Sequence, residues 1–258
     1  MTHRLTLKGL VLEAGGHRLV DDVGFTIRSG ELVALVGESG AGKSLTGRSL
    51  VGIVPPSVQL VTGTVTWHQP DGTMVQIPPA PAAQRSQALV ALRGRGVAWI
   101  PQDARAALIP VHTVQQQLRD ALHHVGQSAT PSDCARQLRA VGFQQPEQVL
   151  GLYPHMLSGG MARRVQVALG LSLGAAFLMA DEPTTGLDRP VQARLLQTPA
   201  SIRDQGTGIV LITHDLRIVQ RHADRVVVLH HGAIVADGEP DLLQTHPHPA
   251  VRRLRGVA

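Results

Sequence analysis

The stretch Gly37-Glu38-Ser39-Gly40-Ala41-Gly42-Lys43-Ser44 decides the fold of this chain. It matches the pattern G-x-x-x-x-G-K-[ST] at every fixed position. The residues before it, Leu32–Val36, form an apolar, partly β-branched run that is short enough to be a buried parallel strand. The residues after it, 43–51, can continue as a helix. We therefore expect a strand, a glycine-rich turn and a helix in succession, which is the setting that this motif requires.

The residue types in the stretch point to phosphate chemistry. Glycines let the backbone curl so that successive N–H groups and the start of the following helix face an anion. Lys43 supplies a mobile positive charge for the β and γ phosphates, and the Ser44 hydroxyl can hold Mg²⁺. The residues predicted to bind the phosphates are Gly37, Ser39, Gly40, Ala41, Gly42, Lys43, Ser44 and Leu45.

Length and composition describe an ordinary globular chain. The 258 residues are 43% hydrophobic and 17% charged, which suits one large domain or two closely packed lobes. The single cysteine, Cys134, excludes an intrachain disulfide and a cysteine-based iron–sulfur or zinc cluster. Charged residues or glycines interrupt every long apolar run, and the first residues lack a signal-peptide core. We therefore expect a cytoplasmic chain that does not cross a bilayer.

The basic charge does not predict a nucleic-acid partner. The formal charge is +5, and it comes almost entirely from arginine, since Lys8 and Lys43 are the only lysines. A basic balance can mean binding to nucleic acid or to an anionic membrane surface. Here the arginines are scattered, and aromatic residues make up 2% of the chain, too few to stack on bases. We interpret the charge as mostly solvated surface and expect no nucleic-acid partner.

The first hundred residues have the pattern of an antiparallel sheet. Two pairs of strand-like stretches are joined through Gly15-Gly16 and across Asp71-Gly72, and the second of these is a hairpin turn signal. A Pro/Ala-rich connector and a helix are expected to follow before the next short buried strand. The predicted segments are strands 4–12, 23–27, 61–67 and 74–77, connector 78–83, helix 84–92 and strand 96–100.

The middle and the end of the chain differ in pattern. Residues 113–151 are polar and helical, with a helix start at Thr130-Pro131, and are expected to form an inserted helical lobe. From residue 176 onward strands and helices alternate, which predicts an α/β fold with a mostly parallel sheet covered on both faces. These segments are 176–180, 191–203, 208–212, 216–223, 225–229 and 233–237.

Two further motifs carry chemistry. Asp181 and Glu182 end an apolar strand, where Asp181 can accept a hydrogen bond from a group that holds Mg²⁺ and Glu182 can deprotonate an attacking water. Ser158-Gly159-Gly160 opens a helix and presents a hydroxyl and free N–H groups to an anion. The simpler interpretation of the second motif is an N-capped helix without any ligand.

Taken together, these motifs resemble the ATP-binding subunit of an ATP-binding-cassette (ABC) transporter along the whole chain. The Q-loop glutamine matches Gln102, the catalytic pair matches Asp181 and Glu182, and the switch histidine matches His214. All the elements occur in the family's order. The complete set is the phosphate loop Gly37–Ser44, Gln102, the signature 157–161, Asp181 and Glu182, the D-loop 186–188 and His214.

The resemblance implies a P-loop NTPase (RecA-like) core made of residues 1–104 and 169–258, with an antiparallel β subdomain at its N-terminal end. A helical subdomain, 105–168, carries the signature. Two such subunits would close face to face over ATP and Mg²⁺, each signature serving the nucleotide of the other. In this family His214 would contact the γ-phosphate, and Gln102 would sense the metal and the attacking water. The implied metal site is Ser44, Gln102 and Asp181, and the implied signature and D-loop contacts are Ser158, Gly159, Gly160 and Asp188.

Within the family the chain is similar to the oligopeptide, dipeptide and nickel importer branch. The residues that carry this likeness are 42–46, 153–161 and His246-Pro247-His248-Pro249. The branch implies a second ATPase subunit (a paralogue or a copy), two permeases and an extracytoplasmic binding protein, with this subunit at the cytoplasmic face of the inner membrane. The short length and residues 52–55 are more similar to the nickel-type first ATPase. Nickel or a metal chelate and peptides both remain open as cargo.

The alternative from another class is a soluble ABC ATPase of translation or DNA repair. Such proteins usually carry two cassettes in one chain or long coiled coils before the signature, and this sequence has neither. A P-loop GTPase is excluded because guanine recognition needs Asn-Lys-x-Asp and the chain contains no asparagine.

Some positions depart from the family pattern. Met161 and Arg163 stand where glutamine is usual, and Pro199 falls inside a predicted helix. The positions where an aromatic residue usually stacks on adenine hold Glu13, Ala14 and His17.

Overall fold

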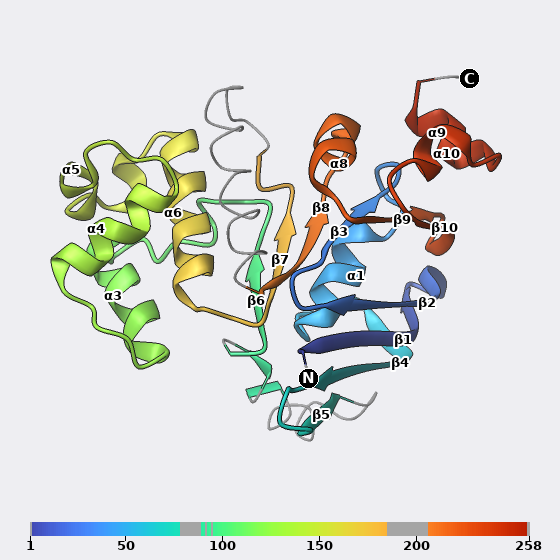
Figure 1. Ribbon diagram of the computed structural model, residues 1–258, viewed down its shortest axis with the longest axis horizontal. Helices are drawn as coiled ribbons and strands as arrows, with labels where there is room; N and C mark the ends of the chain where they lie inside the picture. Colours follow the sequence, from blue (N-terminus) through green and yellow to red (C-terminus); the bar gives the residue numbers. More distant parts are fainter. Residues whose placement is uncertain (1, 78–88, 91, 94, 185–205, 257–258) are drawn as a thin grey trace.

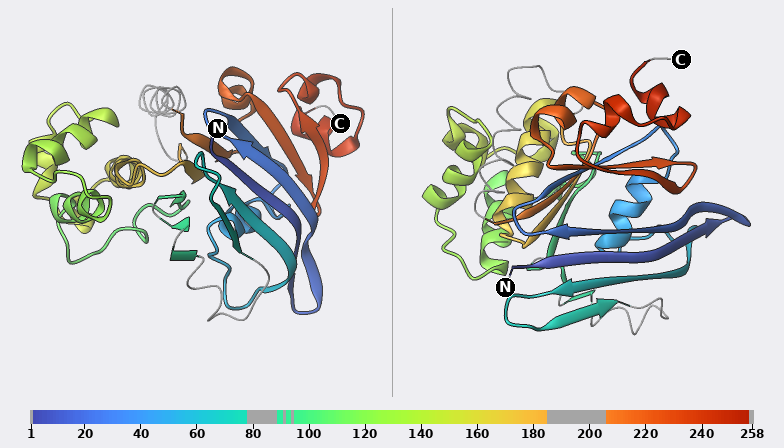
Figure 2. Two further views of the ribbon diagram at one scale, coloured as in Figure 1. Left: turned by 60° about the horizontal axis from the view of Figure 1, so that its bottom comes forward. Right: turned by 45° about the vertical axis from the view of Figure 1, so that its right-hand side comes forward.

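The structure is a computed structural model of the chain, and it describes residues 2–77, 89, 90, 92, 93, 95–184 and 206–256. A six-stranded sheet lies between an antiparallel sheet and a helical lobe, which occupy opposite ends of the molecule (Figures 1 and 2). The predicted connector 78–83, most of the predicted helix 84–92, the D-loop residue Asp188 and the helix containing Pro199 lie outside the described residues.

The central sheet is mostly parallel, as predicted. Its β3, β7 and β8 strands are buried along their whole length, which explains their continuous apolar sequences, since helices and the second sheet cover both faces. Within this sheet, β10 alone of the described strands runs antiparallel to its neighbour. In spatial order the strands are β10 (Ala233–Gly238), β9 (Arg225–His230), β3 (Leu32–Val36), β8 (Gly208–Ile212), β7 (Phe177–Asp181) and β6 (Val97–Ile100).

The antiparallel sheet has the strand order β2-β1-β4-β5 and forms both predicted hairpins. Its first two strands are longer than the sequence predicts, because polar residues such as Arg18 and Asp21 continue the hairpin beyond the apolar alternation. The helix α1 (Lys43–Leu50) contributes Leu50 to the same apolar cluster as this sheet and one face of the central sheet. The strands are β1 (Arg4–Ala14), β2 (His17–Arg28), β4 (Gln59–His68) and β5 (Met74–Ile77).

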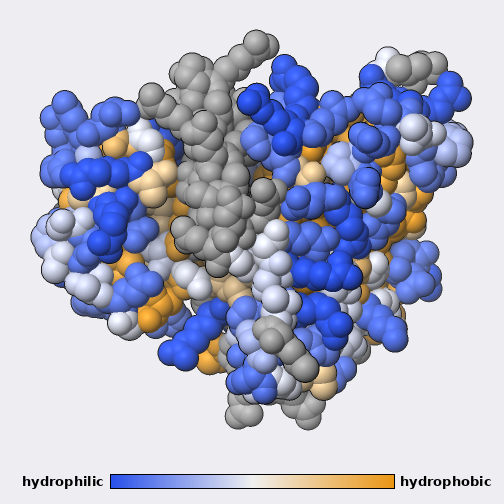
Figure 3. Space-filling view, in the orientation of Figure 1, coloured by the Kyte–Doolittle hydropathy of each residue, from blue (hydrophilic) through white to orange (hydrophobic). Residues whose placement is uncertain are grey.

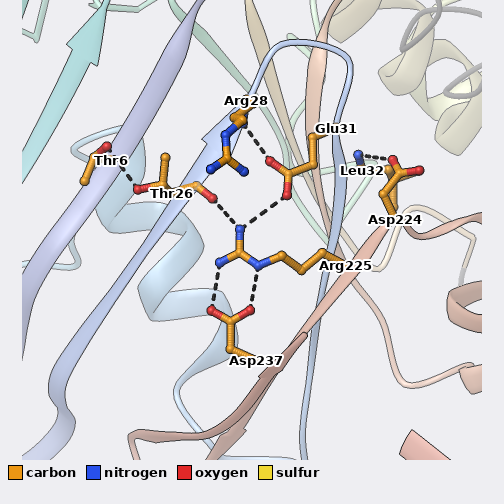
Figure 4. A network of polar contacts seen from close by, with 8 residues as sticks. All are labelled: Thr6, Thr26, Arg28, Glu31, Leu32, Asp224, Arg225 and Asp237. Carbon is orange, nitrogen blue, oxygen red and sulfur yellow. Dashed lines mark hydrogen bonds and ion pairs between the residues drawn. The ribbon is translucent and has the colours of Figure 1, made fainter. Parts of the chain in front are cut away.

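A polar hub joins the two sheets (Figure 4). Arg225, at the start of β9, donates to the backbone oxygen of Thr26 in β2 at 2.8 Å and to Glu31 at 3.3 Å. The same guanidinium forms two bonds to Asp237 of β10, at 2.6 and 2.7 Å. This geometry uses the planar fork of arginine, which a lysine could not reproduce.

The helical lobe forms as predicted from Thr113 onward. Thr113 and Thr130 begin the first two helices with capping boxes, and Pro131 occupies the first turn of the second. The last helix packs on β6, and its residues share an apolar cluster with the central sheet. The predicted subdomain boundary at residue 168 falls inside this helix, so the division into two subdomains stays a proposal. The helices are α3 (Val114–His124), α4 (Pro131–Ala140), α5 (Pro146–Leu150), η1 (Pro154–Met156) and α6 (Gly159–Ser172).

The C-terminal part covers the rest of the sheet face on which α6 packs. Val219 of α8 packs with Ala34 of β3, and Leu243 and Val251 from the tail complete the same cluster. None of the helices that the structure describes combines the length and the apolar character needed to cross a membrane. These helices are α8 (Leu216–His222), α9 (Leu242–Thr245) and α10 (Pro249–Leu254).

The topology brings the predicted site residues to one edge. The strands β3, β8, β7 and β6 are parallel neighbours, so their carboxyl ends meet at the same side of the sheet. Ligands of open α/β folds bind at this side. The segments that leave these four strands begin with the phosphate loop, Thr213-His214, Glu182 and Pro101-Gln102 respectively.

Candidate functional site

The phosphate loop connects β3 to α1 in a conformation that requires glycine. A Cβ on Gly37 would lie 2.2 Å from the Leu229 backbone oxygen, so any side chain there would force the loop away from β9. Gly42, the residue before α1, has φ +95°, in the left-handed region that favours glycine. No described side chain caps α1. Its first N–H groups are therefore available to an anion.

Lys43 is held by the loop itself. Its Nζ donates to the backbone oxygens of Gly37 and Glu38, both at 2.8 Å. Burial lowers the pKa of Lys43, while the charges of Glu182 and Asp181 act in the opposite direction. The ammonium group is thus partly desolvated and bound to neutral carbonyl groups. Phosphate oxygens are charged and bind an ammonium group more strongly, so they can take the place of these carbonyl groups.

Ser44 and Asp181 form a buried oxygen pair. The Ser44 hydroxyl donates to Asp181 Oδ1 at 3.1 Å, and Asp181 is 1% exposed. Its other oxygen, Oδ2, has no hydrogen-bond partner among the described residues. Burial raises the pKa of Asp181, opposed by the Ser44 bond and the charge of Arg48. A buried, unpartnered carboxylate oxygen beside a hydroxyl is the kind of donor set that fits Mg²⁺.

Glu182 and His214 form a second pair beside the first. His214 Nδ1 lies 2.7 Å from Glu182 Oε1, and the Glu182 N–H donates to the Ile212 oxygen at 2.9 Å. Glu182 has φ +49°, a left-handed conformation that is uncommon for a residue with a side chain. The Glu182 side chain is 14% exposed and that of His214 is 71% exposed. The carboxylate is therefore shielded, and the imidazole faces the open side of the site.

The Q-loop and the signature face the site from the helical side. Gln102 is exposed and lines an open cleft of about 500 Å³ together with Arg48 of α1 and Gly159 of α6. Ser158, which precedes α6, accepts a hydrogen bond from the Met161 N–H at 3.2 Å. Ser158 and Gly159 are exposed, so the signature bonds within its own helix and not to the phosphate loop of the same chain. Asp188 lies outside the described residues.

Comparison with known proteins identifies the family. A family profile described as "ABC transporter" matches residues 20–185. The chain belongs to the ABC transporter family. It is an ABC ATP-binding subunit, and the activity of the cassette is ATP hydrolysis.

The ABC subunit has curated relatives over nearly its whole length. It is 38% identical over 257 residues to "Nickel import ATP-binding protein NikD" of Rhodospirillum rubrum, covering 97% of this chain and 93% of the relative. Its identity to the protein of the same name from Brucella abortus is 37% over 258 residues, with the same coverage. It is also 38% identical over 240 residues to "Peptidoglycan transport ATP-binding protein YejF" of Agrobacterium fabrum, which covers 91% of this chain but 42% of that longer protein.

Solved structures agree with the ABC fold. An ATP-binding subunit of an ABC transporter superposes with a TM-score of 0.77 at 26% identity and covers 98% of both chains. A bacterial ABC transporter cassette, solved as a dimer, gives a TM-score of 0.77 at 22% identity, with coverage of 92% of this chain and 98% of the other. At that identity the second likeness concerns the fold alone.

Sequence analysis missed one contact to the phosphate loop of this ABC subunit. Arg253 of α10 donates to Glu38 at 2.7 Å, and His230 Nδ1 lies 3.8 Å from the same carboxylate. The Arg253 bond is the largest cause of a lowered pKa at Glu38. Glu38 occupies a variable position of the motif and Arg253 is 215 residues away, so no local signal pointed to the pair.

Most aromatic side chains of the chain belong to the apolar core. Of the six in the sequence, Phe25, Trp67, Phe143 and Phe177 are buried, Trp99 packs against the core, and Tyr153 stacks on His155 in the helical lobe. His17, which begins β2, is exposed.

Proposed function

We propose that this chain is the ATP-hydrolysing subunit of an importer complex that takes up nickel, a metal chelate, or oligo- and dipeptides. The observation that carries the ATPase mechanism is the convergence of Lys43, the Ser44–Asp181 pair and the Glu182–His214 pair at one edge of the sheet. The relatives whose names mention nickel import and peptidoglycan transport support the importer part.

In this mechanism the phosphate loop binds the triphosphate and Glu182 handles the proton. Lys43 leaves the Gly37 and Glu38 carbonyl groups for the β and γ phosphates, while N–H groups at the start of α1 donate to phosphate oxygens. Ser44 and Asp181, with Gln102, would hold Mg²⁺, which neutralises charge on the β and γ phosphates when bound. Glu182 accepts the proton of the attacking water, and His214 orients that carboxylate and contacts the γ-phosphate.

The signature serves a second subunit. Ser158, Gly159 and Gly160, with Asp188, bind the nucleotide that the phosphate loop of a partner holds, so that two subunits close face to face over ATP. The exposure of Ser158 and Gly159 and the open start of α6 support this role. The partner is a second ATP-binding subunit, either a paralogue or a copy of this chain.

The helical lobe contacts the permeases at the cytoplasmic face of the inner membrane. Four large apolar side chains are exposed on it, namely Ile109, Val111, Tyr153 and Met156. The Val114 N–H donates to the Leu152 oxygen at 2.9 Å, which holds the two segments that carry them side by side. Apolar surface is visible between the hydrophilic side chains of the lobe (Figure 3). A surface of this kind suits two permease subunits, which in turn meet an extracytoplasmic binding protein.

An uptake assay with the complete complex tests the proposal. Cells that carry this subunit should accumulate labelled nickel, a nickel chelate or labelled peptides, and cells carrying Glu182→Gln should lose that uptake. The E147Q variant serves as control because Glu147 lies on the surface of the helical lobe. The importer proposal would be contradicted if cells carrying E182Q kept all three uptakes. It would also be contradicted if the subunit purified with ribosomes in place of permeases.

A further inference from the structure

Two adjacent arginines on α6 have different environments. Arg164 donates to the backbone oxygens of Gly160 and Gly142, and its guanidinium lies 4.0 Å from the centre of the Phe143 ring, all within the helical lobe. Arg163 is 6% exposed and points the other way, towards the segment that follows β6. It stands where the family usually has glutamine.

Arg163 binds the backbone of the Q-loop. Its Nη1 donates to the Pro101 oxygen at 2.9 Å and to the Gln166 side chain at 3.0 Å, and its Nη2 donates to the Gln102 oxygen. Gln166 Nε2 donates to the same Pro101 oxygen at 2.7 Å. Two consecutive carbonyl groups of the Q-loop are therefore fixed to α6.

A contact in the opposite direction completes the connection. Arg105, three residues after Gln102, donates from Nη2 to the Leu157 oxygen at 3.1 Å, immediately before Ser158. The Asp103 carboxylate shapes this segment by accepting the N–H groups of Arg105 and Ala106 at 3.0 and 3.1 Å. The Q-loop and the start of the signature helix thus hold each other from both sides.

The burial of the charged Arg163 side chain costs free energy, which its hydrogen bonds to the Q-loop offset. Burial lowers its pKa, and the charges of Asp103, Asp181 and Glu182 offset part of that effect. A planar guanidinium carries five donors in a fixed fork and can hold two carbonyl groups and an amide at once, whereas a glutamine has two donors on a single nitrogen.

We propose that Arg163 is a positioning residue that fixes the backbone of Gln102 to the signature helix, so that Gln102 and Ser158 move as one unit. Without Arg163 the Gln102 carbonyl group would lose its bond to α6, and β6, which ends two residues earlier at Ile100, would place Gln102 to a greater extent. The inference rests on the proposed role of Gln102 in ATP hydrolysis. The hydrogen bonds of Arg163 go to Pro101, Gln102 and Gln166, so it acts through Gln102.

The test separates binding from turnover in the full chain. Arg163→Ala should lower kcat for ATP about ten-fold by misplacing Gln102, with the Kd for ATP changed less than about two-fold. Amide hydrogen exchange in residues 101–106 should become faster, while exchange in the phosphate loop stays unchanged. R163K and R163Q keep part of the hydrogen bonding, so both kcat and the protection from exchange should lie between those of the wild type and R163A. These two variants also keep the test usable if R163A does not fold.

Two controls decide between the alternatives. Arg164→Ala should lower Tm but leave exchange in residues 101–106 unchanged, because its bonds to Gly160 and Gly142 and its contact with the Phe143 ring lie inside the lobe. A normal kcat for R163A, or a lowered kcat with unchanged exchange in residues 101–106, would overturn the proposal. Gln102→Ala tests the underlying role separately. If Q102A turns over normally, the proposed role of Gln102 fails, and the exchange measurement still decides whether Arg163 holds the loop.

Discussion

The helices α1 and α6 both begin at sequences that suit an anion, yet their first turns differ. Ahead of α1 stands Gly42, which has no side chain, and the neighbouring Lys43 donates to two carbonyl groups of the loop. Ahead of α6 stands Ser158, whose hydroxyl already accepts the Met161 N–H. The start of α1 is therefore open within one chain, while the start of α6 is satisfied locally.

This difference assigns an order to binding. The groups around α1 come from three strand ends of the same sheet, so these groups are assembled before any partner arrives. The Ser158 hydroxyl must exchange or share its bond before it can serve a phosphate. A serine cap of this kind contributes about 1 kcal/mol to the helix. We infer that ATP binds first at α1 and that only the bound nucleotide recruits the α6 of a partner.

The largest expected effect tests the α1 side. Lys43→Ala should weaken ATP binding about 100-fold and reduce kcat/KM by at least about 1,000-fold, because it removes the charge that meets the β and γ phosphates. Equilibrium binding and steady-state hydrolysis measure the two effects. Lys8→Ala is the matched control, since Lys8 is the only other lysine and is exposed. Undiminished ATP affinity in K43A would remove the basis for the assigned order.

Blocking the chemistry should have the next largest effect. Glu182→Gln should lower kcat about 1,000-fold, because the positioned base is lost, with ATP affinity close to that of the wild type. Since the α1 site stays loaded, the variant should associate with its partner subunit in the presence of ATP, as sedimentation would measure. Normal turnover in E182Q would contradict the role of Glu182, and association that ignores ATP would contradict the order.

A smaller effect is expected at α6. Ser158→Ala should cost about 1 kcal/mol of stability through the lost cap and lower kcat about 10-fold, while the Kd for ATP of the isolated chain stays unchanged. The matched control is Thr113→Ala, which removes the equivalent cap of α3. Both variants should lose similar stability in denaturant titrations, and only S158A should lose turnover. Equal kcat in the two variants would show that Ser158 is a cap and nothing more.

The two helix starts also differ in how well the sequence predicted them. The common location of the phosphate loop, Asp181, Glu182 and His214 could be predicted because each lies at the end of a short apolar strand, and parallel strands place their ends together. Their roles stay predictions. For Ser158 the sequence left two interpretations open, a helix cap and an anion ligand. The structure has the cap, and the second role depends on a partner that a single chain does not specify.

What the sequence could not predict depends on long side chains and on packing. Arg163 reaches a carbonyl group 61 residues away, and Arg225 reaches Thr26 across 199 residues. Neither pair follows from spacing, because the partners meet only after the sheets and the helical lobe have packed. The lengths of β1 and β2 were underestimated because polar residues near the hairpin conceal the strand pattern.

The smallest expected effect concerns the free energy of unfolding. A substitution beside the start of α1 should raise it, whereas a substitution at the start of α6 should lower it. Asp181→Asn should increase the free energy of unfolding at pH 7 when nucleotide and Mg²⁺ are absent, whereas S158A decreases it. The reason is burial, which raises the pKa of Asp181 in the folded state. Below the ordinary value of about 3.9 both states are protonated and the variant gains nothing. The gain should grow as the pH rises from this value to the raised pKa of the folded state, and it should stay constant at higher pH.

Asp133 supplies the control with the reverse sign. Hydrogen bonds from Thr130 and Ser128 hold the pKa of Asp133 at about 2, so its contribution to stability is present above its ordinary pKa and is lost as the pH falls towards 2. Asp133→Asn should therefore lower the free energy of unfolding at pH 7. Urea titrations at pH 4.5 and 7.5 measure both variants. If D181N also loses stability at pH 7.5, the ionised Asp181 carboxylate stabilises the folded state. Its burial then costs no free energy that a bound cation could restore.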